Sequence, residues 1–127
     1  MKVLLDTHTF LFAVIQPERL SPLVRETLLQ EEVSKWVSVV SFWEIILKIQ
    51  IGKLDLPIDL TFYQKHLRKL QAAVLPVDAQ HSFELIQLPL LHKDPFDRLL
   101  IAQARVEQMI LLTRDEIIAQ YPVSTLW

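Results

Sequence analysis

The sequence contains no cysteine and a single glycine among its 127 residues. Without cysteine the chain has no disulfide framework, no thiolate metal ligand and no thiol nucleophile, which excludes zinc ribbons, iron–sulfur sites and cysteine-based catalysis. With Gly52 alone, neither a G-x-G-x-x-G motif nor a Walker loop can be written, so nucleotide binding through glycine-rich phosphate loops is excluded too. A chain without disulfides fits a reducing compartment, and we expect a cytoplasmic location.

Long apolar runs and an excess of basic charge are also missing. Hydrophobic residues make up 51% of the chain, but charged residues such as Asp6, Glu44 and Arg98 interrupt every apolar stretch before it reaches the roughly 18 residues of a membrane span. We therefore expect no membrane partner. The formal net charge of −2 differs from that of a general nucleic-acid binder, whose basic excess releases counterions from phosphates. Any contact with RNA must then be local.

The length predicts a single domain over residues 1–127, large enough to bury its own core. Short apolar runs predict strands at 2–5, 36–40, 74–77 and 109–112, with a short edge strand at 122–125 as an optional fifth. Helical spacing and capping residues predict helices starting near Thr7 and spanning about 22–32, 41–51, 60–73, 79–87, 95–106 and 116–120. This alternation predicts an α/β fold with a mostly parallel sheet of four or five strands, covered by helices on both faces.

Four acidic residues stand at the end of an expected strand or in the first turn of an expected helix: Asp6, Glu44, Asp97 and Asp115. A parallel sheet brings strand ends and helix starts to one edge, where α/β folds bind ligands, so we expect the four carboxylates to converge. Crowded carboxylates disfavour one another's ionisation, and Mg²⁺ or Mn²⁺ would supply compensating charge and oxygen coordination. Such clusters carry out in-line displacement at phosphorus. The pattern therefore predicts a metal-dependent phosphodiesterase site.

Each acid also has a purely structural explanation. Asp6 could cap the first helix, and Glu44 would complete a capping box with Ser41. Asp97 lies in a first helical turn, where the helix dipole favours negative charge, and Asp115 could begin a short helix. Taken one at a time, these alternatives stay open, and the case for a site depends on the four acids together.

Four segments match a known family: Val3 to Thr7 (VLLDT), Ser41-x-x-Glu44, residues 92–104 (HKDPFDRLLIAQA) and residues 112–115 (LTRD). With these segments the chain resembles the PIN domain, and within it the VapC-like toxins of type II toxin–antitoxin pairs. The resemblance covers essentially the whole chain, including the spacing between the acids. Its most specific part is the DPFDR block at 94–98.

The resemblance implies a PIN-like three-layer α/β/α fold and an endoribonuclease that depends on Mg²⁺ or Mn²⁺. Asp6, Glu44, Asp97 and Asp115 carry over as the catalytic, metal-binding residues, with Asp6 and Asp97 as the principal ligands. The resemblance also implies an RNA substrate, a small antitoxin protein with a segment in the acidic groove, and a homodimer.

Several further residues are candidates whose role the sequence leaves open. Asp94 could join the site or only cap the helix before Pro95, and Thr113 could position a ligand or serve the strand end. His92 could contact a phosphate or lie at a polar rim. Basic residues that could hold phosphates, or could equally form salt bridges, are Lys48, Lys93, Arg98 and Arg114. Aromatic residues that could stack on bases, but whose apolar neighbours and helical spacing favour core or dimer packing, are Trp36, Phe42, Trp43, Phe62 and Phe96.

Two other functions compete with a nuclease. A metal-dependent phosphatase or phospho-acceptor domain also uses a strand-end aspartate, but a haloacid-dehalogenase-like phosphatase needs a second Asp two residues later, where this chain has His8. The other is a non-catalytic PIN-like domain that binds RNA or protein while its acids only cap helices. A melting temperature raised by Mg²⁺ would favour a metal site over simple capping.

Overall fold

The computed structural model describes all residues from Met1 to Trp127. Its strands are β1 (Lys2–Leu5), β2 (Ser34–Ser38), β3 (Ala72–Leu75), β4 (Ile110–Leu112) and β5 (Thr125–Leu126). Its α-helices are α1 (Thr7–Ile15), α2 (Pro22–Leu29), α3 (Val39–Gln50), α4 (Leu60–Leu70), α5 (Ala79–Glu84) and α6 (Pro95–Glu107). Short 3₁₀ helices cover Pro17–Arg19, Leu85–Gln87 and Ile118–Gln120. None of the helices combines the length and apolar character that a membrane span requires.

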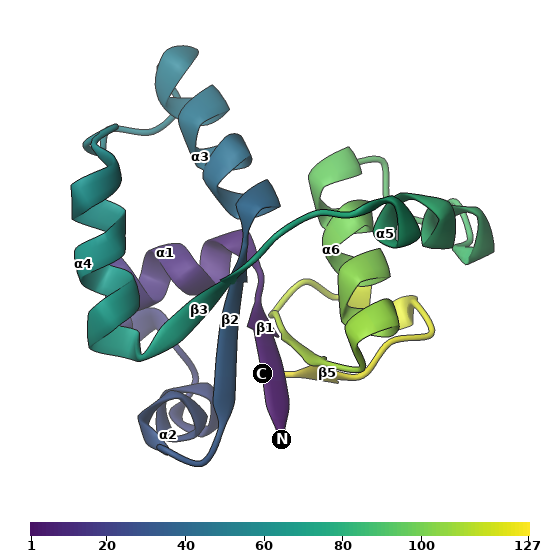
Figure 1. Ribbon diagram of the computed structural model, residues 1–127, viewed down its shortest axis with the longest axis horizontal. Helices are drawn as coiled ribbons and strands as arrows, with labels where there is room; N and C mark the ends of the chain where they lie inside the picture. Colours follow the sequence, from purple (N-terminus) through teal and green to yellow (C-terminus); the bar gives the residue numbers. More distant parts are fainter.

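The five strands form one parallel sheet in the order β3-β2-β1-β4-β5. The chain moves outward from β1 through β2 to β3 and then crosses to β4 on the other side of β1. The strand order therefore reverses between β1 and β4, and open α/β sheets bind ligands beyond the carboxyl ends of the strands at such a point. In Figure 1, α3 and α6 stand on either side of this end of β1.

Helices cover both faces of the sheet. Val3 and Leu5 of β1 belong to one apolar cluster with residues of α1, α2 and α4. Leu4, which points to the opposite face, belongs to a second cluster with residues of β4 and α6. Figure 1 shows α1, α2 and α4 on one side of the sheet and α5 and α6 on the other. The expected three-layer α/β/α fold with a parallel sheet is confirmed, and the sheet has five strands.

The second strand and the helix after it begin and end earlier than the sequence predicts. Val39 and Val40 are β-branched and favour a strand, but the strand ends at Ser38 and α3 starts at Val39. The reason is that Ser38 Oγ accepts a hydrogen bond from the backbone N–H of Val40 and caps the helix. Ser41 therefore lies inside the helix, and the expected capping box with Glu44 is wrong.

Other boundaries differ where the chain makes a local turn. The helix expected at 60–73 ends at Leu70, because Gln71 adopts a left-handed conformation (φ 55°), and β3 accordingly starts at Ala72. The helix expected at 22–32 ends at Leu29, and the fifth strand covers Thr125–Leu126 instead of 122–125. Gly52 follows α3 with φ +77°, the helix-ending conformation that glycine adopts without strain.

A buried polar chain links the start of α3 to α6 and to the segment that precedes α5. Ser38 Oγ, besides capping α3, donates to Gln103 Oε1 at 2.5 Å. The Gln103 side chain is fully buried, and its Nε2 donates to the carbonyl of Pro76 at 3.2 Å. Since α3 carries Glu44 and α6 carries Asp97, this chain of hydrogen bonds fixes the helices that hold two of the four acids.

We expect Gln103→Leu to lower the free energy of unfolding by about 2 kcal/mol, because it leaves buried polar partners without hydrogen bonds. Gln64→Leu, the same substitution at an exposed position of α4, should change it by less than about 0.5 kcal/mol. Urea denaturation of the two variants measures the difference. Equal effects of the two substitutions would contradict a stabilising role for Gln103.

Candidate functional site

Asp6 directly follows β1 and caps α1. Its Oδ1 accepts the backbone N–H of Thr9 at 2.7 Å, and its own N–H donates to the carbonyl of Leu112 in β4 at 3.1 Å. The residue is 4% exposed. Only Oδ1 of Asp6 caps the helix. Capping therefore accounts for one carboxylate oxygen, and Oδ2 is left for another partner.

Glu44 lies on the buried side of α3. Its Oε2 is 2.9 Å from the ammonium group of Lys48, one helical turn later. Its Oε1 is buried and has no hydrogen-bond partner. A buried carboxylate oxygen without a partner is unfavourable by several kcal/mol in an apolar setting. This oxygen is therefore a position where a cation would be stabilising.

Asp94 and Asp97 lie at the start of α6. Asp94 is the N-cap, since its Oδ1 accepts the backbone N–H groups of Phe96 at 2.8 Å and Asp97 at 3.4 Å. This is the capping role that the sequence offered for Asp94. The Asp97 carboxylate is not used by the cap, and its Oδ2 lies 3.1 Å from Nε2 of His92.

The electrostatics of Asp97 show how close the other acids are. Burial, followed by the negative charges of Asp94, Glu44 and Asp6, raises the pKa of Asp97 to about 7, although His92 opposes the shift. Carboxylates from β1, α3 and α6 therefore act on one another, as the strand ends and helix starts suggested. No protein cation fully compensates their charge.

Asp115 follows β4 and has a different environment. Burial alone would raise the pKa of Asp115, but hydrogen bonds from His92 and from the backbone N–H groups of Ile117 and Ile118 outweigh it, and the pKa is lowered. Thr113 Oγ1 accepts the backbone N–H of Asp115 at 3.0 Å, so the hydroxyl shapes the turn that presents this acid. Asp115 is thus held as a carboxylate.

His92 bridges two of the acids. Its Nε2 lies 3.1 Å from Asp97 Oδ2 and 3.0 Å from Asp115 Oδ2. Its Nδ1 accepts the backbone N–H of Asp94 at 3.2 Å, so the ring hydrogen must be on Nε2. An Nε2–H group donates to carboxylates and offers no lone pair to a metal. His92 therefore belongs to the site as a hydrogen-bond donor, a role that the sequence left open.

The same reasoning applies to a second trio, Asp78, His81 and Glu107, whose ligand atoms also lie within 4.8 Å of one another. His81 Nδ1 accepts the backbone N–H of Asp78 at 3.1 Å, and Nε2 lies 2.7 Å from a Glu107 oxygen. With its hydrogen on Nε2, His81 is satisfied on both nitrogens. The trio holds the start of α5 against α6 and therefore has a structural role.

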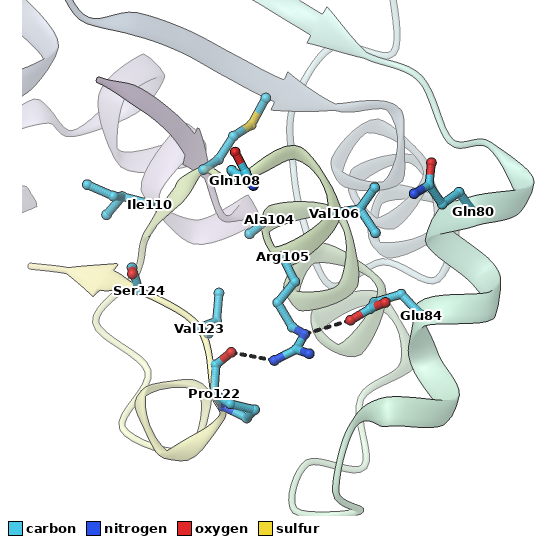
Figure 2. Close-up of a pocket in the computed structure, with 11 residues that line it drawn as sticks. Gln80, Glu84, Ala104, Arg105, Val106, Gln108, Ile110, Pro122, Val123 and Ser124 are labelled. Atoms are coloured by element: carbon cyan, nitrogen blue, oxygen red, sulfur yellow. Dashed lines mark hydrogen bonds and ion pairs between the residues drawn. The ribbon is translucent and has the colours of Figure 1, made fainter.

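A hollow of about 500 Å³ lies at the other end of α6 (Figure 2). The Arg105 side chain extends across this hollow and already has two partners. Its Nε donates to Glu84 Oε1 at 2.8 Å, and its Nη1 donates to the carbonyl of Pro122 at 2.6 Å. The lining of the hollow brings no group of acids together. We therefore place the candidate site at the carboxylates and not in this hollow.

Both arginines named from the sequence already have partners within the protein. Arg98 donates to the carbonyl of Pro89 at 2.7 Å and to the Tyr121 hydroxyl at 3.1 Å, which ties down the segment that carries His92. The Arg114 guanidinium lies over the Phe12 ring, 4.8 Å from its centre. Arg98 is therefore a structural residue, whereas Arg114 also lines the hollow around Asp6 and Asp115.

Comparisons with known proteins match this chain to one family. The family model for the PIN domain matches residues 3–123. A search of curated protein sequences found no match.

Solved structures of toxin–antitoxin complexes are similar in fold. A chain of VapBC2 from Rickettsia felis bound to a promoter DNA fragment aligns with a TM-score of 0.71 and 17% identity, over 99% of this chain and 98% of that one. DNA-bound VapBC from Salmonella typhimurium gives a TM-score of 0.67 and 17% identity, over 99% and 97% of the two chains. VapBC-1 from nontypeable Haemophilus influenzae gives 0.60 and 16%, over 99% and 97%.

The pKa of Asp97 should be measurable by NMR titration of its carboxyl carbon without divalent ions, with an expected value of about 7. Glu44→Gln should lower this pKa, because it removes a nearby negative charge. Glu26→Gln, the same change on the exposed surface of α2, should leave it unchanged. An ordinary aspartate pKa in the wild-type protein would contradict the burial of Asp97, and an unchanged pKa in Glu44→Gln would contradict the proximity of the two acids.

The raised pKa also sets the sign of a pH effect on stability. Asp97 binds its proton more tightly in the folded protein than in the unfolded chain, where its pKa is about 3.9. The contribution of this proton to the free energy of unfolding is therefore fully present below about pH 4 and is lost as the pH rises through about 7. The lowered pKa of Asp115 has the opposite effect: its carboxylate stabilises the folded state when ionised, and this stabilisation is lost as the pH falls. Asp97→Asn should remove the loss of stability between about pH 4 and 7.

Proposed function

The chain belongs to the PIN domain family, and from that premise we propose that it is an endoribonuclease that hydrolyses RNA phosphodiester bonds with Mg²⁺ or Mn²⁺. The observation that carries the proposal is the excess of negative charge at the carboxyl end of β1. Glu44 presents a buried oxygen without a partner, and three neighbouring carboxylates help to raise the pKa of Asp97 to about 7. A divalent cation would stabilise both groups.

The donor set fits a hard cation. Asp6, Glu44, Asp97 and Asp115 offer only carboxylate oxygens, which Mg²⁺ and Mn²⁺ prefer. We propose Asp6 and Asp97 as the principal ligands, with Glu44 and Asp115 completing the site directly or through water. A bound ion would supply an activated water and neutralise charge on the scissile phosphate.

The protein's own residues prepare this site in distinct ways. Asp6 and Asp115 are fixed by backbone N–H groups that follow their strands. His92 holds Asp97 and Asp115 together through one Nε2–H group. Lys48 neutralises one oxygen of Glu44 and leaves the other for the site. Such fixed positions reduce the reorganisation that binding an ion and a phosphodiester would require.

We further propose that the protein acts as the toxin of a toxin–antitoxin pair. The support is the likeness of its fold to chains of VapBC complexes, which span nearly the same length. In this proposal a small antitoxin protein covers the acidic groove, and the toxin forms a homodimer in the cytoplasm. A neighbouring gene that encodes a small DNA-binding protein, together with co-purification of that protein with this chain, would support the toxin–antitoxin proposal.

Purified protein with Mg²⁺ or Mn²⁺ should cut single-stranded or structured RNA, and EDTA should stop the reaction. Asp6→Asn should lower the rate at least about 100-fold, because the amide keeps the helix cap but loses the charge that would hold the ion. Gel analysis of labelled RNA measures the rate, and circular dichroism checks that the variant folds.

Asp59→Asn is the matched control. Asp59 caps α4 through Oδ1 as Asp6 caps α1, but it is exposed and away from the acids. It should keep the full rate. Cutting that resists both EDTA and Asp6→Asn would refute the metal-dependent nuclease and leave helix capping as the role of Asp6.

A further inference from the structure

A hollow of about 370 Å³ opens beside the acidic cluster, between α3 and the start of α6. Glu44 and Asp94 are among its lining residues, so it adjoins the site described above. Its other walls come from apolar side chains and from three lysines. The lining lysines and apolar residues are Leu47, Lys48, Ile51, Lys53, Lys93, Pro95 and Phe96.

Two of the three lysines are available for a ligand. Lys48 is paired with Glu44 at 2.9 Å. Lys53 and Lys93 are exposed and take part in none of the ion pairs of the structure. Two unpaired ammonium groups beside a hollow, in a chain with a net charge of −2, make a local positive rim. Such a rim is complementary to a polyanion.

An exposed aromatic side chain lies next to the same hollow. Trp43 of α3 is 60% exposed, and its ring packs edge-on against Phe96, with 4.8 Å between ring centres and an interplanar angle of 77°. Phe96 itself lines the hollow. An exposed aromatic ring is thus held against a residue that lines the hollow, and single-stranded nucleic acids stack their bases on such rings.

The hollow does not end at the lysines. Lys48 and Lys53 also line a neighbouring hollow of about 250 Å³, together with His8 and other residues of α1. His8 in turn lines the hollow that contains Asp6, Arg114 and Asp115. Neighbouring hollows thus share lining residues and form a series from Phe96 to Asp6 and Asp115.

We propose that this series holds a single strand of RNA across the acidic cluster, with Lys53 and Lys93 binding backbone phosphates and Trp43 stacking on a base. The inference rests on the proposed function, because it supplies the substrate contacts for that reaction. A strand needs both phosphate and base contacts on one side of the scissile bond. The lysines that line the 370 Å³ hollow would supply the first, and Trp43, which packs against the lining residue Phe96, would supply the second. Lys53, Lys93 and Trp43 are here substrate-binding residues, outside the group that would hold the ion.

The binding test uses a fluorescein-labelled single-stranded RNA with Mg²⁺, in an Asp6→Asn background that prevents cutting. Fluorescence anisotropy over a range of salt concentrations should show that Lys53→Ala with Lys93→Ala weakens binding about tenfold or more. The slope of log K against log salt should fall by about 0.7 for each phosphate contact removed. Lys65→Ala with Lys69→Ala, which removes two exposed lysines of α4, should change neither quantity.

A kinetic test in the wild-type background separates this inference from the proposed function. The Lys53→Ala, Lys93→Ala variant should have a raised KM for RNA and a nearly unchanged kcat, since it loses binding and keeps the acids. If wild-type protein cuts RNA and this variant binds and cuts equally well, the lysine contacts are wrong and the nuclease stands. Protein that binds RNA through these lysines and never cuts it would support the contacts and overturn the hydrolysis.

Trp43 distinguishes RNA from a protein partner. RNA should quench the fluorescence of Trp43, assigned by comparison with Trp43→Phe, and Trp43→Ala should weaken RNA binding more than Trp43→Phe does. Sedimentation of the same samples should show an unchanged oligomeric state. If Trp43→Ala dissociates an oligomer and leaves the affinity of the remaining protein for RNA intact, the ring belongs to a protein interface and the stacking role is overturned.

Discussion

The repulsion among buried carboxylates is the constraint on which the rest of this structure depends. Asp6, Glu44, Asp94 and Asp97 come from three separate elements, yet their charges act on one another strongly enough to help raise the pKa of Asp97 to about 7. A fold gains nothing from such crowding alone, since like charges in a buried setting oppose folding. Protonation of Asp97 or binding of a cation would relieve this repulsion, and the second possibility links the energetics of the protein to its proposed function.

The parallel sheet imposes the crowding, and specific hydrogen bonds maintain it. The reversal of strand order places the ends of β1 and β4 side by side, where the N–H of Asp6 donates to the carbonyl of Leu112. The Thr7 hydroxyl donates to Ser41 at 3.0 Å and joins α1 to α3 beside the acids. On the other flank, the polar chain through Gln103 joins α3 to α6. The helices therefore cannot move apart to relieve the repulsion without breaking buried hydrogen bonds.

Features set by neighbouring residues could be predicted from the sequence, and features set by distant contacts could not. The end of β1 at Asp6, the cap at Asp94 and the helix end at Gly52 depend on local chemistry and were predicted. The bridging position of His92 depends on the Tyr121 hydroxyl, which accepts its backbone N–H at 2.7 Å from 29 residues away. One feature of the sequence does indicate this role of His92, namely its spacing of two residues from Asp94. This spacing lets His92 Nδ1 accept the backbone N–H of Asp94 and leaves the Nε2–H group for the acids. The cap at Ser38 was missed because β-branched Val39 and Val40 favour a strand locally.

The most direct test of the central claim is to locate the ion. Crystals soaked in Mn²⁺ should show an anomalous peak with oxygens of Asp6 and Asp97 at about 2.1–2.2 Å, typical of a hard divalent ion, and with Glu44 and Asp115 bound directly or through water. Glu44→Gln crystals under the same conditions should show a weaker peak. Well-diffracting crystals that contain no manganese among these carboxylates, at a concentration that supports RNA cutting, would contradict the account.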